Sequence, residues 1–123
     1  MEVTLYDEQG QPVAYIAADG ENSIYTWEGN AVSYVADDNI YGWNGQHLGW
    51  FIDGIAYDLQ GYKVGSIAER CSYATYAQPA KYAKYAKYAK YAKYARYAAY
   101  ARPALSASYG RTNLLDFINS GAP

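Results

Sequence analysis

Residues 40–51 read IYGWNGQHLGWF, and three other stretches of the chain repeat their pattern. These other copies are LYDEQGQPVAYI (5–16), IYTWEGNAVSYV (24–35) and AYDLQGYKVGSI (56–67). Each copy has a Tyr four residues before a Gly, an aliphatic residue three after that Gly, and another apolar residue six after it. The four glycines are Gly10, Gly29, Gly45 and Gly61. Their steps of 19, 16 and 16 residues leave room for one β-hairpin in each copy.

An X-Gly pair lies at the centre of every copy and suits a two-residue hairpin turn, because Gly accepts a positive φ without steric cost. Asn44-Gly45 is the strongest of these turn signals. With that pair as the turn, Tyr41 faces Leu48 across the ladder. One face of this hairpin then carries four large side chains: Tyr41, Trp43, Leu48 and Trp50.

The joints between the copies are also turns, at Asp19-Gly20, Asp37-Asp38-Asn39 and Asp53-Gly54. The copies therefore predict an all-β meander of eight short strands. Repeated units that cannot bury an apolar face alone must stack or close, and closing four hairpins around a pseudo-fourfold axis also removes exposed sheet edges. We predict four tandem β-hairpins closed into a small barrel.

The position four residues after each turn glycine is always small. The four residues are Ala14, Ser33, Gly49 and Gly65. Equivalent small residues indicate a crowded place near the axis of the barrel, where backbones or large neighbours approach closely. Taken singly, each is also an ordinary permissive strand position.

The length of 123 residues allows one domain with an appendage. We divide the chain into a fourfold repeat domain (1–70), a triplet tract (71–104) and a loop with a short helix (105–123). No apolar run is long enough for a transmembrane segment, and no signal peptide is recognisable, so we expect a cytoplasmic protein. Cys71 is the only cysteine, which excludes an intrachain disulfide.

The net charge of −2 conceals two halves of opposite sign. Residues 1–70 contain eleven acidic residues against Lys63 and Arg70, a net charge of −9, whereas residues 71–123 carry +7. Opposite charges of this size attract each other within one molecule or between molecules. They predict either a tail folded onto its own domain or a homo-oligomer.

From Tyr73 to Arg102 the sequence keeps a period of three: Tyr or Pro, then Ala, then in most triplets Lys or Arg. Polyproline II geometry has three residues per turn and would give the tract one Tyr edge, one Ala edge and one basic edge. An α-helix is the main alternative, because Ala and Lys are good helix formers, but the tyrosines would then spiral around it. A disordered tail is a third alternative. We favour the extended, polyproline II-like form.

The last segment predicts a short helix from Leu114 to Asn119, with Asn113 as its N-cap and Asp116 in its first turn. Four side chains give it an apolar face that requires a docking site: Leu114, Leu115, Phe117 and Ile118.

The repeats with their turn glycines, the segment NGQHLGWFIDG (44–54), the basic triplet tract and the closing LLDF (114–117) together resemble the bacterial fourfold β-flower proteins. The resemblance covers nearly the whole chain and implies a shallow, pseudo-symmetric β-barrel with an apolar central channel. In that family the tract is rich in Pro and Val, where this chain has Tyr and Ala, which do not lock φ as Pro does. The resemblance carries over no biochemical activity.

The sequence offers little catalytic chemistry. His47 is the only histidine, and we interpret it as a polar residue beside a turn, held by a neighbour, rather than as a catalytic base. Cys71 is interpreted as a small hydrophobe rather than a nucleophile. Turn aspartates such as Asp19 and Asp53 do not have the spacing of a calcium loop, and we expect neither enzyme activity nor a metal or cofactor.

Three functions remain. The first is a structural or interaction module that associates with itself. The second is a channel or aromatic platform that binds a lipophilic ligand, with five candidate residues: Tyr25, Trp27, Tyr41, Trp43 and Trp50. The third is binding of nucleic acid or another polyanion by the tract, through Lys81, Tyr82, Lys84, Tyr85, Lys87, Tyr88, Lys90, Lys93 and Arg96. We favour the first and regard nucleic acid as the weaker partner, because the basic tract is tethered to an acidic domain of its own.

Overall fold

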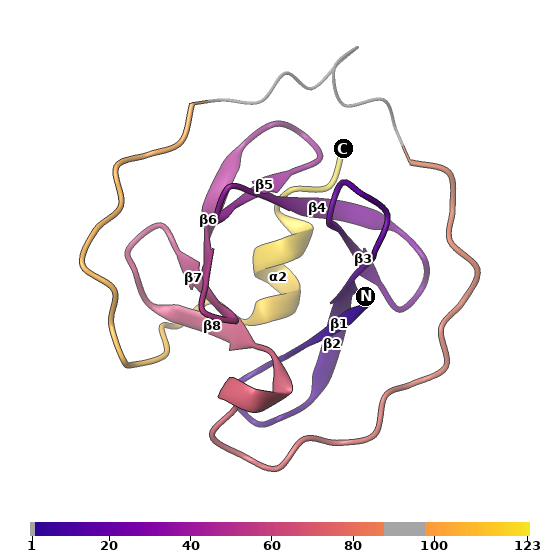
Figure 1. The fold of residues 1–123 in the computed structure, drawn as a ribbon, viewed down its shortest axis with the longest axis horizontal. Coiled ribbons are helices and arrows are strands. Elements are labelled where there is room, and N and C mark those ends of the chain that lie inside the picture. The colour runs from indigo at the N-terminus through magenta and orange to yellow at the C-terminus, as the bar shows by residue number, and fades with distance from the viewer. Residues whose placement is uncertain (1, 88–97) are drawn as a thin grey trace.

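The computed structural model describes residues 2–87 and 98–123, and eight strands in sequence order form one closed antiparallel barrel (Figure 1). The strands are β1 (Val3–Tyr6), β2 (Pro12–Ile16), β3 (Ser23–Thr26), β4 (Ala31–Ala36), β5 (Asn39–Gly42), β6 (His47–Ile52), β7 (Ile55–Asp58) and β8 (Lys63–Ser66). Each repeat forms one hairpin, as predicted, and β1 pairs with β8 to close the ring, through Tyr6 and Ser66.

The hairpin turns differ from the prediction by one residue. In the third copy, the amide of Gly45 donates to the carbonyl of Gly42 at 2.9 Å, and the amide of Gly42 donates to the carbonyl of Gln46 at 2.8 Å. The loop is therefore three residues long, with Gly45 at φ +91°. The other three copies repeat this pattern, which is a turn followed by a left-handed glycine that shifts the ladder. The predicted two-residue turn is wrong.

A β-bulge in each hairpin follows from this turn. Ile40 pairs with Gly49 and Tyr41 pairs with His47, so Leu48 has no partner in the ladder. Tyr41 therefore does not face Leu48, and the predicted shared face of Tyr41, Trp43, Leu48 and Trp50 is also wrong. In every hairpin the unpaired residue is the aliphatic one that follows the turn glycine by three: Val13, Val32, Leu48 and Val64.

The bulged residues belong to the core of the ring. Val32, Leu48 and Val64 are at most 7 % exposed, and Val13 packs against the same cluster. The residue before each repeat tyrosine forms a second layer that is at most 1 % exposed: Leu5, Ile24, Ile40 and Ala56. The core is thus built from equivalent positions of the four copies.

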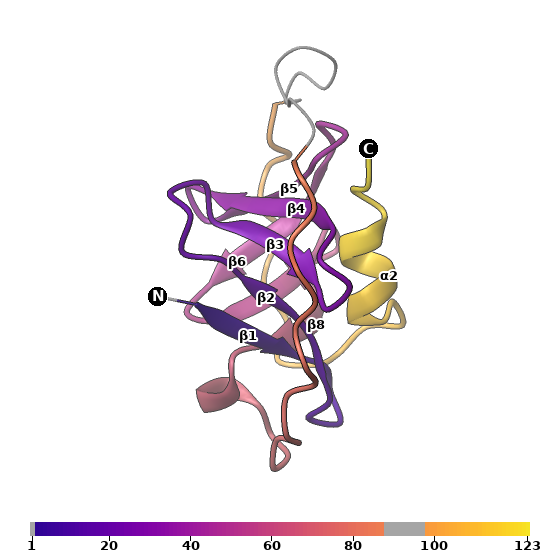
Figure 2. The ribbon, with the colours of Figure 1, turned by 90° about the vertical axis from the view of Figure 1, so that its right-hand side faces the viewer.

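A short helix, α2 (Leu114–Asn119), lies at the centre of the ring in Figure 1 and at one end of the barrel in Figure 2. The side chain of Asn113 caps it by accepting from the amide of Asp116 at 2.8 Å, as predicted. Leu114, Phe117 and Ile118 join the core cluster, whereas Leu115 is 44 % exposed. The apolar face of the helix therefore docks on the ring with three of its four predicted residues.

The small residues four places after the turn glycines explain how α2 fits into the end of the barrel. A Cβ at Gly49 would collide with the carbonyl oxygen of Tyr57 and would lie 3.0 Å from Cζ of Phe117. A Cβ at Gly65 would lie 2.7 Å from Cδ2 of Leu114 and 2.8 Å from the carbonyl oxygen of Tyr6. A side chain at either position would press on the backbone of a neighbouring strand as well as on the helix. The prediction of a crowded place near the axis is therefore confirmed at these two glycines.

A one-turn 3₁₀ helix, η1 (Ala68–Arg70), ends the ring, and residues 71–87 and 98–104 lie along the outside of the barrel (Figures 1 and 2). The described residues of the triplet tract, 73–87 and 98–102, contain neither helix nor strand. The alternative of an α-helix is therefore not found in these residues. No helix among residues 2–87 and 98–123 has the length and apolarity needed to cross a membrane.

Candidate functional site

The contact surface between the tract and the ring is built from the hairpin turns. The amide of Tyr76 donates to the carbonyl of Gly10 at 3.0 Å, and the amide of Tyr85 donates to the carbonyl of Gly29 at 2.9 Å. The amide of Ser106 donates to the carbonyl of Gly61 at 2.9 Å. Within the described residues, the turns of the first, second and fourth repeats therefore hold the outer chain in the same way.

These turns also require glycine for a second reason. A Cβ on Gly10, Gly29 or Gly61 would lie at 2.5 Å or less from a carbonyl oxygen of the outer chain, and the three oxygens belong to Ala74, Ala83 and Ala104. In each contact, the residue two places after that alanine donates the amide described above. The outer chain thus touches each turn with one carbonyl and one amide, and no side chain of either partner is required.

In the described part of the triplet tract, the amides that bond to the ring come from the first position of a triplet. Besides the three at the turns, Tyr82 donates to the carbonyl of Trp27 at 3.1 Å and Tyr100 donates to Nδ1 of His47 at 3.1 Å. The first position also holds Pro79 and Pro103, which have no amide hydrogen to donate. The period of three therefore brings the same backbone position to the ring in these described triplets, where Tyr76, Tyr82, Tyr85 and Tyr100 donate their amides.

The tyrosine side chains of these triplets are exposed. Tyr73, Tyr76, Tyr82, Tyr85 and Tyr100 are between 57 and 66 % exposed. The amides of Tyr76, Tyr82, Tyr85 and Tyr100 are bonded to the barrel, while all five side chains are more than half exposed. We call these five side chains the tyrosine edge.

The lysines at the third position of these triplets lie instead over aromatic side chains of the barrel. Nζ of Lys81 is 4.9 Å from the ring centroid of Tyr15, and Nζ of Lys84 is 5.0 Å from that of Tyr25. Nζ of Lys87 is 5.8 Å from the ring of Trp43. Cations at this range above an aromatic face are attracted by its quadrupole.

Acidic groups complete these lysine contacts. Lys81 pairs with Glu2, and Lys87 pairs with Asp19 at 2.9 Å and with Glu21 at 2.5 Å. Burial by itself would raise the pKa of Asp19, but hydrogen bonds from Lys87 and Ser23 hold it well below its usual range. Burial would likewise lower the pKa of Lys87, whereas Glu21 and Asp19 raise it above its ordinary value. In these described residues the basic tract meets the acidic domain of its own chain.

The five aromatic residues predicted as a ligand platform lie in two groups rather than on one shared surface. Tyr25 and Trp27 lie with Tyr15 in one cluster, and Tyr41 and Trp43 lie with Tyr34 in another. Trp50 packs against His47, with ring centroids 4.9 Å apart, and the ring of His47 lies 5.2 Å from that of Tyr41, so His47 links Trp50 to the second cluster. All five residues lie outside the aliphatic core cluster that contains α2.

The polymer-binding candidates are only partly described. Lys81, Lys84 and Lys87 lie over the aromatic clusters as above, and Tyr82 and Tyr85 belong to the tyrosine edge. The remaining four, Tyr88, Lys90, Lys93 and Arg96, lie outside the described residues.

His47 is the polar residue that joins the ring to the returning half of the outer chain. It is 3 % exposed, its Nε2 lies 3.1 Å from Oδ1 of Asn39, and its Nδ1 accepts from the amide of Tyr100. Burial lowers its pKa, and a backbone hydrogen bond at Gly49 opposes that effect. Both ring nitrogens are thus engaged in the neutral form, which agrees with the interpretation of His47 as a residue held by its neighbours.

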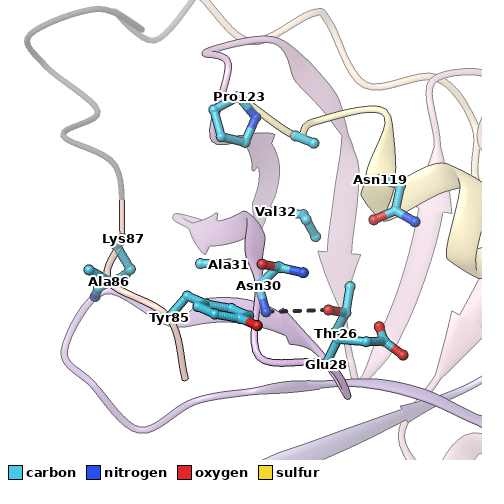
Figure 3. Close-up of a pocket in the computed structure, with 11 residues that line it drawn as sticks. Thr26, Glu28, Asn30, Ala31, Val32, Tyr85, Ala86, Lys87, Asn119 and Pro123 are labelled. Carbon is cyan, nitrogen blue, oxygen red and sulfur yellow. Dashed lines mark hydrogen bonds between the residues drawn. The ribbon is translucent and has the colours of Figure 1, made fainter. Parts of the chain in front are cut away.

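The described residues include no group of three or more His, Cys, Asp or Glu side chains that could hold a metal ion. The sulfur of Cys71 is partly buried and donates to the carbonyl of Asp7 at 3.7 Å. A pocket of about 800 Å³ lies beside the β3–β4 hairpin (Figure 3). One of its walls is the tract.

These features define a class of protein: a closed ring of four β-hairpins with a C-terminal helix at its centre. The chain matches the model of the 4-fold beta flower protein family over residues 3–118, and it belongs to that family. The resemblance noted from the sequence is therefore confirmed. Neither a curated protein nor a solved structure matches this chain.

Proposed function

We propose that this protein is a non-enzymatic structural and interaction module that presents the tyrosine edge to a partner, and that its first partner is another copy of the same chain. The observation that carries the proposal is that the backbone and the side chain of the first triplet position face opposite ways. The first-position backbone is bonded to the ring, while five tyrosine side chains remain more than half exposed. Large exposed apolar surfaces on a rigid backbone favour interaction sites, because little conformational entropy is lost on binding.

Charge attraction between copies has less support than aromatic contact. Lys81 and Lys87 pair with acidic residues of their own ring. Ammonium groups that are already paired gain little from a second carboxylate on another molecule. We therefore expect self-association that depends on tyrosine rings and changes little with salt.

Sedimentation velocity of the full chain tests this proposal. The variant Tyr76→Ser/Tyr82→Ser/Tyr85→Ser keeps every backbone amide and removes three rings of the edge. We expect its self-association to be at least about tenfold weaker, because three aromatic contacts are lost. The matched control replaces the same three tyrosines by Phe and should associate as the unchanged chain does.

Two results would refute the proposal. One is a monomer at every concentration and salt. The other is association that high salt abolishes and that the serine variant retains. This result would show that attraction between opposite charges drives the association.

The other candidate functions have less support. A polyanion would have to compete for Lys81 and Lys87 with carboxylates already beside them. A lipophilic ligand on the axis would have to share the space with Leu114, Phe117 and Ile118, which pack into the ring core.

A further inference from the structure

The pocket beside the β3–β4 hairpin lies where three distant parts of the chain meet (Figure 3). The β3–β4 hairpin contributes Glu28, Asn30 and Ala31, the tract contributes Tyr85, and the C-terminal segment contributes Asn119. The side chains of Glu28 and Asn119 and the ring of Tyr85 border the same open space in the close-up. The pocket therefore combines a carboxylate, two amides and an aromatic ring.

The lysines of the tract show which chemical groups the surface of the barrel binds. Lys81, Lys84 and Lys87 each place an ammonium group on an alkyl stem over a Tyr or Trp ring of the barrel. Lys81 and Lys87 add a carboxylate to that arrangement. An aminoalkyl group held between an aromatic face and an acidic oxygen is thus a repeated contact of this surface.

The pocket offers the same groups to a ligand from outside. Glu28 is exposed and has no ion pair within residues 2–87 and 98–123, and Lys87 at the rim is occupied by Asp19 and Glu21. The wall between them contains Ala31 and Val32, against which methylene groups can pack.

We propose that this pocket binds a small aliphatic diamine, with one ammonium group at Glu28 and the methylene chain along Ala31 and Val32. Tyr85 supplies an aromatic face to the bound cation, and the amides of Asn30 and Asn119 accept hydrogen bonds from its ammonium groups. This site is separate from the proposed self-association, because it needs the carboxylate of Glu28 and only one ring of the tyrosine edge.

Titration of the full chain with 1,5-diaminopentane, followed by backbone amide NMR at low salt, tests the proposal. We expect saturable shifts at residues 26–32 and 119–122. Glu28→Gln should weaken binding about fivefold, in the range expected for an exposed ion pair supported by neighbouring contacts. The matched control is Glu8→Gln, which removes the same charge from the β1–β2 turn outside the pocket and should bind as the unchanged chain does.

A second ligand and two Tyr85 variants separate the contributions of the charge, the methylene chain and the aromatic ring. 1-Pentanol has the methylene chain without the charge and should cause no saturable shifts. Tyr85→Phe should retain binding, and Tyr85→Ser should weaken it. Equal weakening by Glu28→Gln and Glu8→Gln would show general attraction to an acidic protein and would overturn the proposal. So would shifts that do not include residues 26–32.

Discussion

Replacing Gly29 by Ala tests whether the hairpin turns hold the tract. Gly29 has φ +101°, and Gly20 has φ +81°, so Ala is strained by about 1–2 kcal/mol at either position. The surroundings of the two glycines differ. A Cβ at Gly20 would meet no atom within 4 Å, whereas a Cβ at Gly29 would press on the backbone carbonyl of Ala83 at less than 3.0 Å. A backbone carbonyl cannot rotate away as a side chain can, so the tract must move.

The extra cost follows from the hydrogen bonds that such a movement breaks. The amides of Tyr85 and Tyr82 donate to Gly29 and Trp27, and each bond contributes about 0.5–1.5 kcal/mol. Gly29→Ala should therefore destabilise the chain by about 1–3 kcal/mol more than Gly20→Ala does. Once those two bonds are broken, further displacement of the tract adds little to this difference.

Two measurements check this prediction. Guanidinium unfolding followed by tryptophan fluorescence gives the free energies of unfolding, and amide hydrogen exchange reports directly on Tyr82 and Tyr85. Gly29→Ala should accelerate exchange at both amides, and Gly20→Ala should leave them protected. If the two variants are equally stable and both amides stay protected in Gly29→Ala, the turns do not hold the tract and the reasoning fails.

Three further predictions follow from single contacts. Leu114→Ala should lower the free energy of unfolding by about 2–5 kcal/mol, because it opens a cavity beneath α2. Leu115→Ala, on the exposed side of the helix, should lower it by less than about 0.5 kcal/mol. Similar losses in the two variants would contradict the docking of the helix. Burial lowers the pKa of His47, so its contribution to stability is complete above the ordinary pKa of about 6.5 and is lost as the pH falls through the lower folded value. Because protonated Nδ1 cannot accept from Tyr100, hydrogen exchange at that amide should accelerate in the same pH range, and His47→Gln should remove this pH dependence. Lys87→Met should raise the pKa of Asp19, measured by carboxyl NMR, and lower stability by up to about 1 kcal/mol at low salt only; an unchanged Asp19 titration would contradict the ion pair.

The sequence predicts the hairpins, the closure and the helix because each has a local signal. Positive-φ glycines mark the turns, the four copies have the same length, and Asn113 stands at the expected N-cap of an apolar run. The docked residues Leu114, Phe117 and Ile118 follow the spacing i, i+3, i+4, so the exposure of Leu115 is also readable from the sequence.

The register of the hairpins is harder to predict, because an X-Gly pair fits both a two-residue turn and a three-residue turn that ends in a left-handed glycine. One signal does distinguish them. Leu48 and Gly49 are consecutive, and the structure needs both on the inner side, where one packs in the core and the other admits Phe117. Strict alternation cannot place two neighbours on one face, so a bulge is required.

The path of the tract could not be predicted from side chains. Its turn contacts use backbone carbonyls and amides, which nearly every residue type has. The period of three is readable, but it specifies only that the same backbone group returns to the same side. The identity of the receiving groups, Gly10, Gly29 and Gly61, depends on the left-handed turns, and these follow from the register that the sequence leaves open.

The single helix explains where the four copies differ from one another. One helix cannot touch a fourfold ring in four equivalent ways, so the copies that receive it must change. The first turn position holds Asp7, Thr26 and Asp58 in three copies, each with a side-chain oxygen that accepts an amide of its own turn, but Gly42 in the third. A Cβ at Gly42 would collide with the backbone of Gly121, just beyond α2. The amide of Asn44 donates to the carbonyl of the same Gly121 at 3.0 Å, so the loss of a side chain at position 42 admits the C-terminal segment to this hairpin. A position where one copy departs from the other three therefore indicates a contact with a part of the chain outside the repeats.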